Sequence, residues 1–447
     1  MSSSSSFPVP LGFYTFFFFF LTIFLFTTQA TVPPSKTFKF INEGEFGDYI
    51  VEYEANYRVS DIQTFPFALC FYNTTPNAFT LGLRMGSHRS ESIMRWFWDA
   101  NRANPVRENA TLSFGTNGNL ILIDSDGSVA WQTGTANKGV VGLSLLSNGN
   151  LVLYNQKGRF VWQSFDHPTD TLLVGQSLRP GGPTKLVSRI SAVDGSEGSY
   201  SFEIVQKWYW AMYMKSKNSV KPLLYYVNEF HNGDTLSGLL FNSAPETNEG
   251  YAFELKLEIE RNNVSAGSLI LARPKYNSTL SMLRVEYDGN LKIYTYYDKV
   301  DYGAWQISFN LFDRNGRESE CKLPSRCGSL GVCEDDQCVA CPTPKGLFGW
   351  SKTCTSPVLP PCNKGAIGGK AKVDYYKVVG VDHFLNGYTE GDGPMKVSEC
   401  RDKCSKDCGC LGFFYREESS KCLLAPELGT LTKVSNITHV AFIKYSK

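Results

Sequence analysis

A repeated segment in the first half of the chain most constrains the fold. Residues 117–133 read NGNLILIDSDGSVAWQT and residues 148–164 read NGNLVLYNQKGRFVWQS, at an offset of 31 residues. Each copy is an alternating strand, a turn with a glycine (Gly127 or Gly158), and a second strand that ends in Trp-Gln. A single hairpin cannot bury its apolar face alone. The repeat therefore predicts several β-hairpins packed around a shared core.

A third unit precedes these two, from Phe79 through Trp96 and Trp98 to Arg102. Three units around one axis would bury their tryptophans together. We therefore expect Trp131 and Trp162 to pack in the core rather than to serve as a platform for a sugar.

The N-terminus predicts export. Residues 11–26 are an apolar run of 16 residues without charge, and Thr28-Gln29-Ala30 follow as small residues at which a signal peptidase could cut. The run is short for a membrane span, although the usual basic residues before it are absent and a retained anchor is the alternative. We expect a signal peptide at 1–30, no later membrane span, and a secreted, extracellular product.

Cysteine usage fits this compartment. Twelve of the 13 cysteines lie between Cys321 and Cys422, and dense cysteines in an exported chain predict disulfides rather than zinc ligands. Their pairing does not follow from the sequence, and Cys70 is left over, either buried or available for an intermolecular bridge. The expected disulfide cysteines are Cys321, Cys327, Cys333, Cys338, Cys341, Cys354, Cys362, Cys400, Cys404, Cys408, Cys410 and Cys422.

The strings RWFWDANRANPV, the two NGNL…WQ units and WQSFDHPTDTLLVGQSL resemble the bulb-type, mannose-binding lectin domain of plants. In particular they resemble its version in S-locus glycoproteins and epidermis-specific secreted glycoproteins. The resemblance implies a threefold β-prism whose sugar site is a strand motif, Gln-x-Asp-x-Asn-x-Val-x-Tyr. Alternate residues of a strand point to one face, so this spacing gathers polar groups and one apolar contact against a sugar.

No copy of this motif is intact. The second unit places Leu146 and then Asn148, Asn150, Val152 and Tyr154 at the five positions. The first unit keeps only the central Asn119, and we expect it to be inactive. A later segment, 283–306, echoes the repeat and offers Glu286, Asp288, Asn290, Lys292 and Tyr294, where Lys292 replaces the apolar contact. The predicted sugar-binding residues are Asn148, Asn150, Val152, Tyr154, Asp288, Asn290 and Tyr294.

The cysteine spacings resemble two further modules. Six cysteines from Cys321 to Cys354 are similar to an EGF-like module, and the block from Cys362 to Cys422 resembles the PAN/apple domain of the same plant family. A short helix is expected at Val397–Ser405, with Ser398 as its cap. The predicted fold is thus all-β for most of the chain, with β-prism lectin domains followed by a disulfide-rich EGF-like module and an α+β PAN/apple domain. The expected boundaries are 31–169 and 170–312 for the lectin-like domains, 317–356 for the EGF-like module and 362–447 for the PAN/apple domain.

Five Asn-x-Ser/Thr sequons predict surface N-glycans, at Asn73, Asn109, Asn263, Asn277 and Asn436. The net charge of +1 and the lack of a basic run give no sign of nucleic acid or an anionic membrane as partner. The five histidines are scattered, and no catalytic motif, metal site or cofactor site is evident, so we expect no enzyme.

Two functions remain open. The chain is either a cell-wall or apoplastic lectin for mannose-type glycans, borne for example by other secreted glycoproteins, or a lectin-fold protein that has lost sugar binding. In the second case it would act through protein contacts of the PAN/apple and EGF-like modules, or as a structural wall glycoprotein.

Overall fold

A computed structural model describes residues 31–87, 93–205, 209–229, 236–245, 253–276, 278–360 and 373–447. The expected signal peptide, Asn277 and Cys362 lie outside these residues. The described chain is mostly antiparallel β-sheet, as predicted, and no helix in it is both long and apolar enough to cross a membrane. Its one α-helix is α2 (Val397–Lys406), and the short 3₁₀ segments are η1 (Pro34–Lys36), η2 (Glu52–Glu54), η3 (Ser164–Asp166), η4 (Glu320–Lys322) and η5 (Phe384–Gly387).

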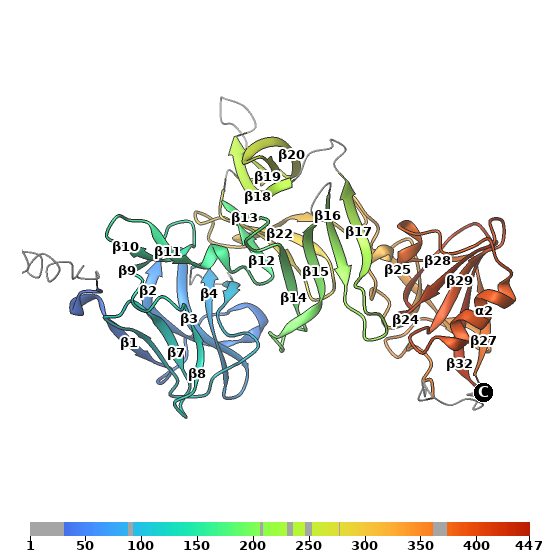
Figure 1. Cartoon of the computed structure of the whole chain (residues 1–447), viewed down its shortest axis with the longest axis horizontal. Coiled ribbons are helices and arrows are strands. Elements are labelled where there is room, and N and C mark those ends of the chain that lie inside the picture. Colours follow the sequence, from blue (N-terminus) through green and yellow to red (C-terminus); the bar gives the residue numbers. More distant parts are fainter. Residues whose placement is uncertain are drawn as a thin grey trace, which may run out of the picture.

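The first third of the molecule is a group of three sheets, hereafter the first group (Figure 1). One sheet has the order β1 (Phe38–Ile41), β6 (Thr111–Phe114), β7 (Leu120–Ile123) and β8 (Val129–Gln132). The second has β11 (Phe160–Gln163), β10 (Leu151–Asn155) and β9 (Val140–Leu145). The third has β2 (Asn56–Thr64), β3 (Phe67–Thr75), β4 (Ala78–Met85) and β5 (Arg95–Asp99).

Three tryptophans join these sheets at their centre. Trp98 comes from β5, Trp131 from β8 and Trp162 from β11. Their ring centroids lie 5.8, 6.1 and 5.8 Å apart, and each pair meets edge to face at 72–74°, the arrangement that ring quadrupoles favour. The predicted convergence of the three units on their tryptophans is confirmed.

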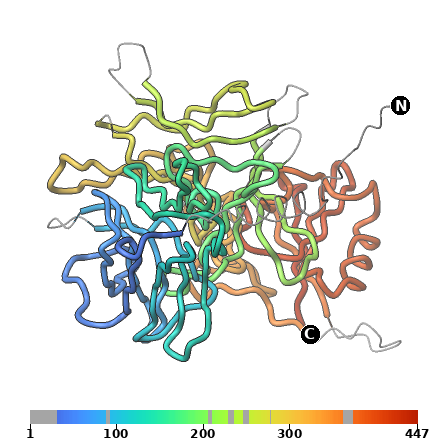
Figure 2. Tube along the Cα trace, turned by 60° about the vertical axis from the view of Figure 1, so that its left-hand side comes forward, coloured from blue at the N-terminus to red at the C-terminus, as the bar shows by residue number. Residues whose placement is uncertain are grey.

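A second group of three four-stranded sheets follows and lies between the first group and the cysteine-rich region (Figure 1, Figure 2). One sheet has the order β12 (Thr171–Leu173), β21 (Ser281–Val285), β22 (Leu291–Tyr296) and β23 (Trp305–Asn310). Another has β13 (Gln176–Leu178), β18 (Leu236–Pro245), β19 (Phe253–Arg261) and β20 (Val264–Ala272). The third has β14 (Lys185–Arg189), β15 (Glu197–Val205), β16 (Tyr209–Met214) and β17 (Leu223–Glu229).

Strands β12, β21 and β22 of the sheet β12-β21-β22-β23 are buried on both faces. Leu172, Leu283 and Ile293 point into the core of the second group. Their chain neighbours Leu173, Met282 and Tyr294 point into the core of the first group. Because successive side chains of a strand face opposite ways, this one sheet belongs to both cores and fixes the two groups against each other.

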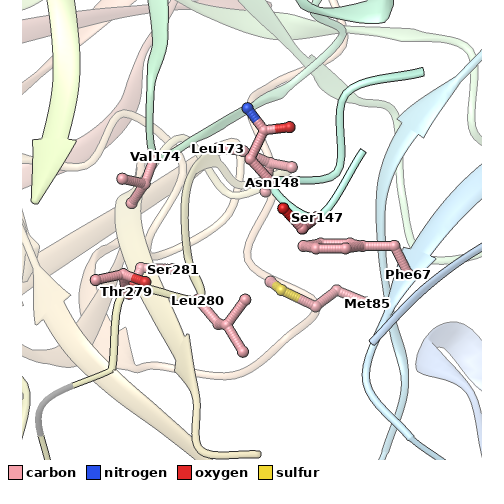
Figure 3. A pocket seen from close by; sticks show the side chains of 9 residues that line it. All are labelled: Phe67, Met85, Ser147, Asn148, Leu173, Val174, Thr279, Leu280 and Ser281. Atoms are coloured by element: carbon pink, nitrogen blue, oxygen red, sulfur yellow. The ribbon is translucent and has the colours of Figure 1, made fainter. Parts of the chain in front are cut away.

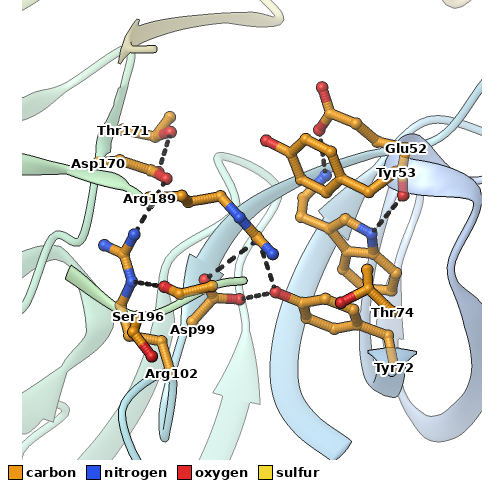
Figure 4. Close-up of polar contacts among 12 residues, drawn as sticks. Glu52, Tyr53, Tyr72, Thr74, Asp99, Arg102, Asp170, Thr171, Arg189 and Ser196 are labelled. Atoms are coloured by element: carbon orange, nitrogen blue, oxygen red, sulfur yellow. Dashed lines mark hydrogen bonds and ion pairs between the residues drawn. The ribbon is translucent and has the colours of Figure 1, made fainter. Parts of the chain in front are cut away.

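Buried ion pairs reinforce this contact (Figure 4). Arg189 of β14 lies 3.9 Å from the carboxylate of Asp99 and donates a hydrogen bond to the Tyr72 hydroxyl at 3.0 Å, and Tyr72 in turn donates to Asp99 at 2.7 Å. Arg284 of β21 pairs with Glu52 at 2.8 Å. Arginine and acid are each less than a tenth exposed in both pairs, so these charges depend on protein partners, several of them across the contact, rather than on water.

The two cysteine modules share one sheet. Its order is β26 (Gly346–Gly349), β25 (Gln337–Thr343), β24 (Leu330–Glu334), β31 (Gly429–Lys433) and β28 (Val381–His383). Strands β24 and β31, about a hundred residues apart in the sequence, pair in parallel with Leu330 opposite Gly429. A second sheet has the order β27 (Val373–Val379), β32 (His439–Ser446), β29 (Gly412–Arg416) and β30 (Lys421–Ala425), and α2 packs against β29 and β30.

Five disulfides have both cysteines in the described chain, in agreement with the expected bonding. They are Cys321–Cys333, Cys327–Cys338, Cys341–Cys354, Cys400–Cys422 and Cys404–Cys410. Cys408 is also disulfide-bonded. Cys70 is free and fully buried, and burial raises the pKa of its thiol to about 11, so it is poorly suited to an intermolecular bridge.

The predicted helix is confirmed, but its predicted cap is wrong. Ser398 lies inside α2, one residue after the helix begins at Val397. The helix is capped at Lys396, whose backbone N–H donates to the carboxylate of Glu399. Glu399 in the first turn therefore satisfies the backbone N–H of the residue that precedes the helix.

Candidate carbohydrate site

The five motif positions of the second unit run along the turn between β9 and β10 and along β10 itself. Asn148 is exposed in the turn, while Leu146 and Tyr154 are half-buried. Asn150 and Val152 are 3% and 1% exposed. The structure thus places Asn148 and Asn150 in the turn before β10 and Val152 and Tyr154 on β10, and it leaves mainly Asn148 and Tyr154 accessible.

Asn150 is held by the fold. Its Nδ2 donates to Oε1 of Gln163 at 2.8 Å, and its Oδ1 accepts from the Ser164 hydroxyl at 3.2 Å and from the Phe165 N–H at 3.3 Å. A carboxamide has two N–H groups and two lone pairs. Both lone pairs and one N–H are therefore in use, and a single N–H is left for any ligand.

Gln163 extends this network, and its role was not predicted. Its Nε2 donates to Asp166 at 2.9 Å, and Asp166 accepts from Arg179. Gln163 lies directly opposite Val152 on the neighbouring strand, so it borders the apolar position of the motif. The signal was present in the sequence, because Trp-Gln ends both repeats at the same distance from the central asparagine.

The central asparagine of the first unit makes an equivalent set of hydrogen bonds. Nδ2 of Asn119 donates to Oε1 of Gln132 at 2.9 Å, and Oδ1 accepts from Thr133 and from the Thr135 N–H. Asn117 accepts from the Asn119 N–H at 3.0 Å, just as Asn148 accepts from the Asn150 N–H at 3.1 Å. The central asparagine therefore closes the hairpin in both units.

The later set of motif residues does not form an open site. Asp288 is exposed, but Asn290 is clamped to the backbone of Phe312, with bonds of 2.8 and 3.1 Å. Tyr294 is 7% exposed, and its hydroxyl donates to Glu286 at 2.7 Å. The guanidinium of Arg95 covers its ring at 4.3 Å. The prediction of Tyr294 as a sugar ligand is corrected: its face of the sheet packs on the first group.

The sequons differ in accessibility. Asn109, Asn263 and Asn436 are exposed, as an N-glycan acceptor requires. Asn73 is 5% exposed, and its Nδ2 donates to the Thr75 carbonyl at 3.1 Å. The expectation of a surface position is wrong for Asn73, because it lies on β3 within the sheet.

Comparison with known proteins gives independent information. Residues 96–192 match the family model described as D-mannose binding lectin. The chain is 51% identical to EP1-like glycoprotein 2 of Arabidopsis thaliana, over 93% of this chain and 95% of that protein. It is 54% identical to the epidermis-specific secreted glycoprotein EP1 of Daucus carota, over 76% of this chain and 94% of that protein. Among solved structures, a two-domain fetuin-binding agglutinin of Scilla campanulata is 12% identical, with a TM-score of 0.21 over 58% of this chain and 96% of that one.

Proposed function

Because this chain belongs to the EP1-like family of lectin-like secreted glycoproteins, we propose that it binds mannose-type glycans through one weak site on the sheet β9-β10-β11. The observation that carries the proposal is the exposed carboxamide of Asn148, on the same motif as the half-buried Tyr154. Glycans of other secreted glycoproteins in the cell wall or apoplast are the proposed ligands. We propose no catalytic role.

The groups that remain free set the expected affinity. Asn148 offers its Nδ2, Asn150 one N–H and Tyr154 its hydroxyl, while Leu146 offers none where the intact motif has a glutamine. Each hydrogen bond between neutral groups contributes only about 1 kcal/mol net. Three such bonds contribute about 3 kcal/mol, so a monosaccharide dissociation constant in the millimolar range follows.

One observation favours the alternative, a lectin-fold protein that acts through protein contacts. The side chain of Asn150, the central residue of the motif, already uses three of its four hydrogen-bonding sites in bonds within the protein. On this alternative, partners bind elsewhere, for example at the PAN/apple region around the sheet β27-β32-β29-β30.

Retention on immobilised mannose separates the two functions. The secreted wild-type protein should be retarded and should elute with free mannose, and Asn148→Ala should abolish the retardation. Asn117→Ala is the matched control, because Asn117 makes the same turn hydrogen bond in the first unit. Equal behaviour of the two variants, or no retardation of the wild type, would refute the proposal.

A further inference from the structure

A pocket of about 270 Å³ opens beside Asn148, where the first group meets β21 (Figure 3). The turn between β9 and β10 forms one side, and the start of β21 forms another. The lining residues are Phe67, Met85, Ser147, Asn148, Leu173, Val174, Thr279, Leu280 and Ser281.

Phe67, Met85 and Leu173 form an apolar wall of the pocket, and the exposed Ser147, Asn148 and Thr279 line its polar side. Phe67, Met85 and Leu173 are 3%, 0% and 3% exposed and present carbon and sulfur atoms. Ser281 adds no free polar group, because its hydroxyl is bonded to Thr295 at 2.9 Å. An apolar wall can bury part of a small molecule, and polar groups beside it can fix its orientation.

The rim carries hydrogen-bonding groups without a protein partner. Oδ1 of Asn148 accepts from the Asn150 N–H, which orients the carboxamide. Its Nδ2 and the hydroxyl of Ser147 make no hydrogen bond within the residues that the structure describes. These groups stand between the sugar motif and the pocket.

We propose that the pocket accepts an aromatic or short alkyl group attached to the sugar that Asn148 contacts. This inference rests on the proposed function, since Asn148 belongs to both the motif and the pocket. A phenyl ring fits, because an apolar cavity of about 150 Å³ suffices to bind benzene. A second sugar ring fits less well, because its hydroxyls would lose water without finding partners on Phe67, Met85 and Leu173.

The test compares phenyl α-mannoside with methyl α-mannoside by titration calorimetry on the full-length secreted protein. Burial of the ring should make phenyl mannoside bind about tenfold more tightly or better. Val174→Phe places a larger side chain at a half-buried position of the pocket. It should bring the ratio of the two dissociation constants toward one and leave the affinity for methyl α-mannoside unchanged. Val373→Phe, half-buried on β27 far along the chain, is the control and should keep the preference.

A second variant guards against misfolding of the first. Leu280→Ala, on the β21 side, removes contacts to the ring and should also weaken phenyl mannoside selectively. Neither substitution alters the sequon Asn277-Ser278-Thr279.

The outcomes separate the two proposals. Equal affinity of the wild type for both mannosides, or a preference that survives in both pocket variants, would overturn the pocket inference and leave the mannose site standing. Absence of binding by either mannoside would overturn the proposed function and this inference with it.

Discussion

The carboxamide of Asn150 donates a hydrogen bond to Gln163 at 2.8 Å, across the sheet from the turn before β10 to the end of β11. The equivalent bond joins Asn119 to Gln132 at 2.9 Å in the preceding unit. The residue at the centre of the mannose motif therefore stabilises the hairpin in each repeat. Sugar recognition and hairpin closure compete for the same side chain.

Asn150→Ala should destabilise the fold by about 1–3 kcal/mol, because it leaves the buried Ser164 hydroxyl and the partly buried Phe165 N–H without their acceptor. Asn148→Ala should cost less than 1 kcal/mol, since Asn148 is exposed. Urea unfolding measures both. Equal free energies of unfolding for Asn150→Ala and wild type would show that the hydrogen bonds of Asn150 do not stabilise the fold.

Trp131→Ala should destabilise the first group by about 3 kcal/mol, because its ring contacts both Trp98 and Trp162. Trp131→Phe should cost less, since an aromatic ring stays in the cluster. Thermal unfolding gives the two values. If Trp131→Phe instead removed mannose retention at unchanged stability, the tryptophan would be a ligand contact and the packing role would be wrong.

Arg189→Met should destabilise the chain by about 3–5 kcal/mol, because it removes the main countercharge of the buried Asp99. Burial already raises the pKa of the Asp99 carboxyl, against the opposing effect of Arg189. Asp99→Asn in the same chain should recover part of the loss, since no buried charge is then unpaired. A double-mutant cycle of unfolding free energies checks this, and strictly additive losses would contradict the pairing.

His383 should make the C-terminal region sensitive to acid. Burial lowers the pKa of His383 to about 3, and its Nδ1 accepts from the Leu385 N–H. The unfolded chain binds the proton near pH 6.5, so the stability present above that pH is lost as the pH falls from about 6.5 toward 3. The slope is at most about 1.4 kcal/mol per pH unit.

His383→Asn keeps an acceptor for the Leu385 N–H but cannot titrate. The variant should be less stable than wild type at pH 7, because the ring contacts with Phe384 and Phe414 are lost. In urea unfolding, the free energy of unfolding should change less between pH 7 and pH 5 for the variant than for wild type. The same pH dependence in both proteins would exclude His383 as its source.

Local patterns predicted the parts of the fold that depend on neighbours in the sequence. The alternation and Trp-Gln endings of the repeats predicted the hairpins, and the clustered cysteines predicted that this region is disulfide-bonded, without the pairing. The parallel pairing of Leu330 with Gly429 joins segments about a hundred residues apart and leaves no local pattern. Likewise, the burial of Tyr294 follows from contact with Arg95 of the first group, which no periodicity encodes.

The residues of the candidate site could be proposed from the sequence, but their hydrogen bonds could not. The spacing from Asn148 to Tyr154 identified the strand, because a period of two is a property of the chain itself. That spacing alone does not show that Asn150 bonds to Gln163, and only the Trp-Gln ending of both repeats carries a signal for this contact. Asn150→Ala is for this reason a poor probe of sugar binding, and Asn148→Ala is a better one.

A crystal structure of the secreted protein with methyl α-mannoside tests the central claim most directly. The account predicts sugar density against Asn148 and Tyr154 on the sheet β9-β10-β11, with Asn150 still bonded to Gln163. Sugar bound at another sheet, or an empty β9-β10-β11 sheet at a ligand concentration well above 1 mM, would contradict it.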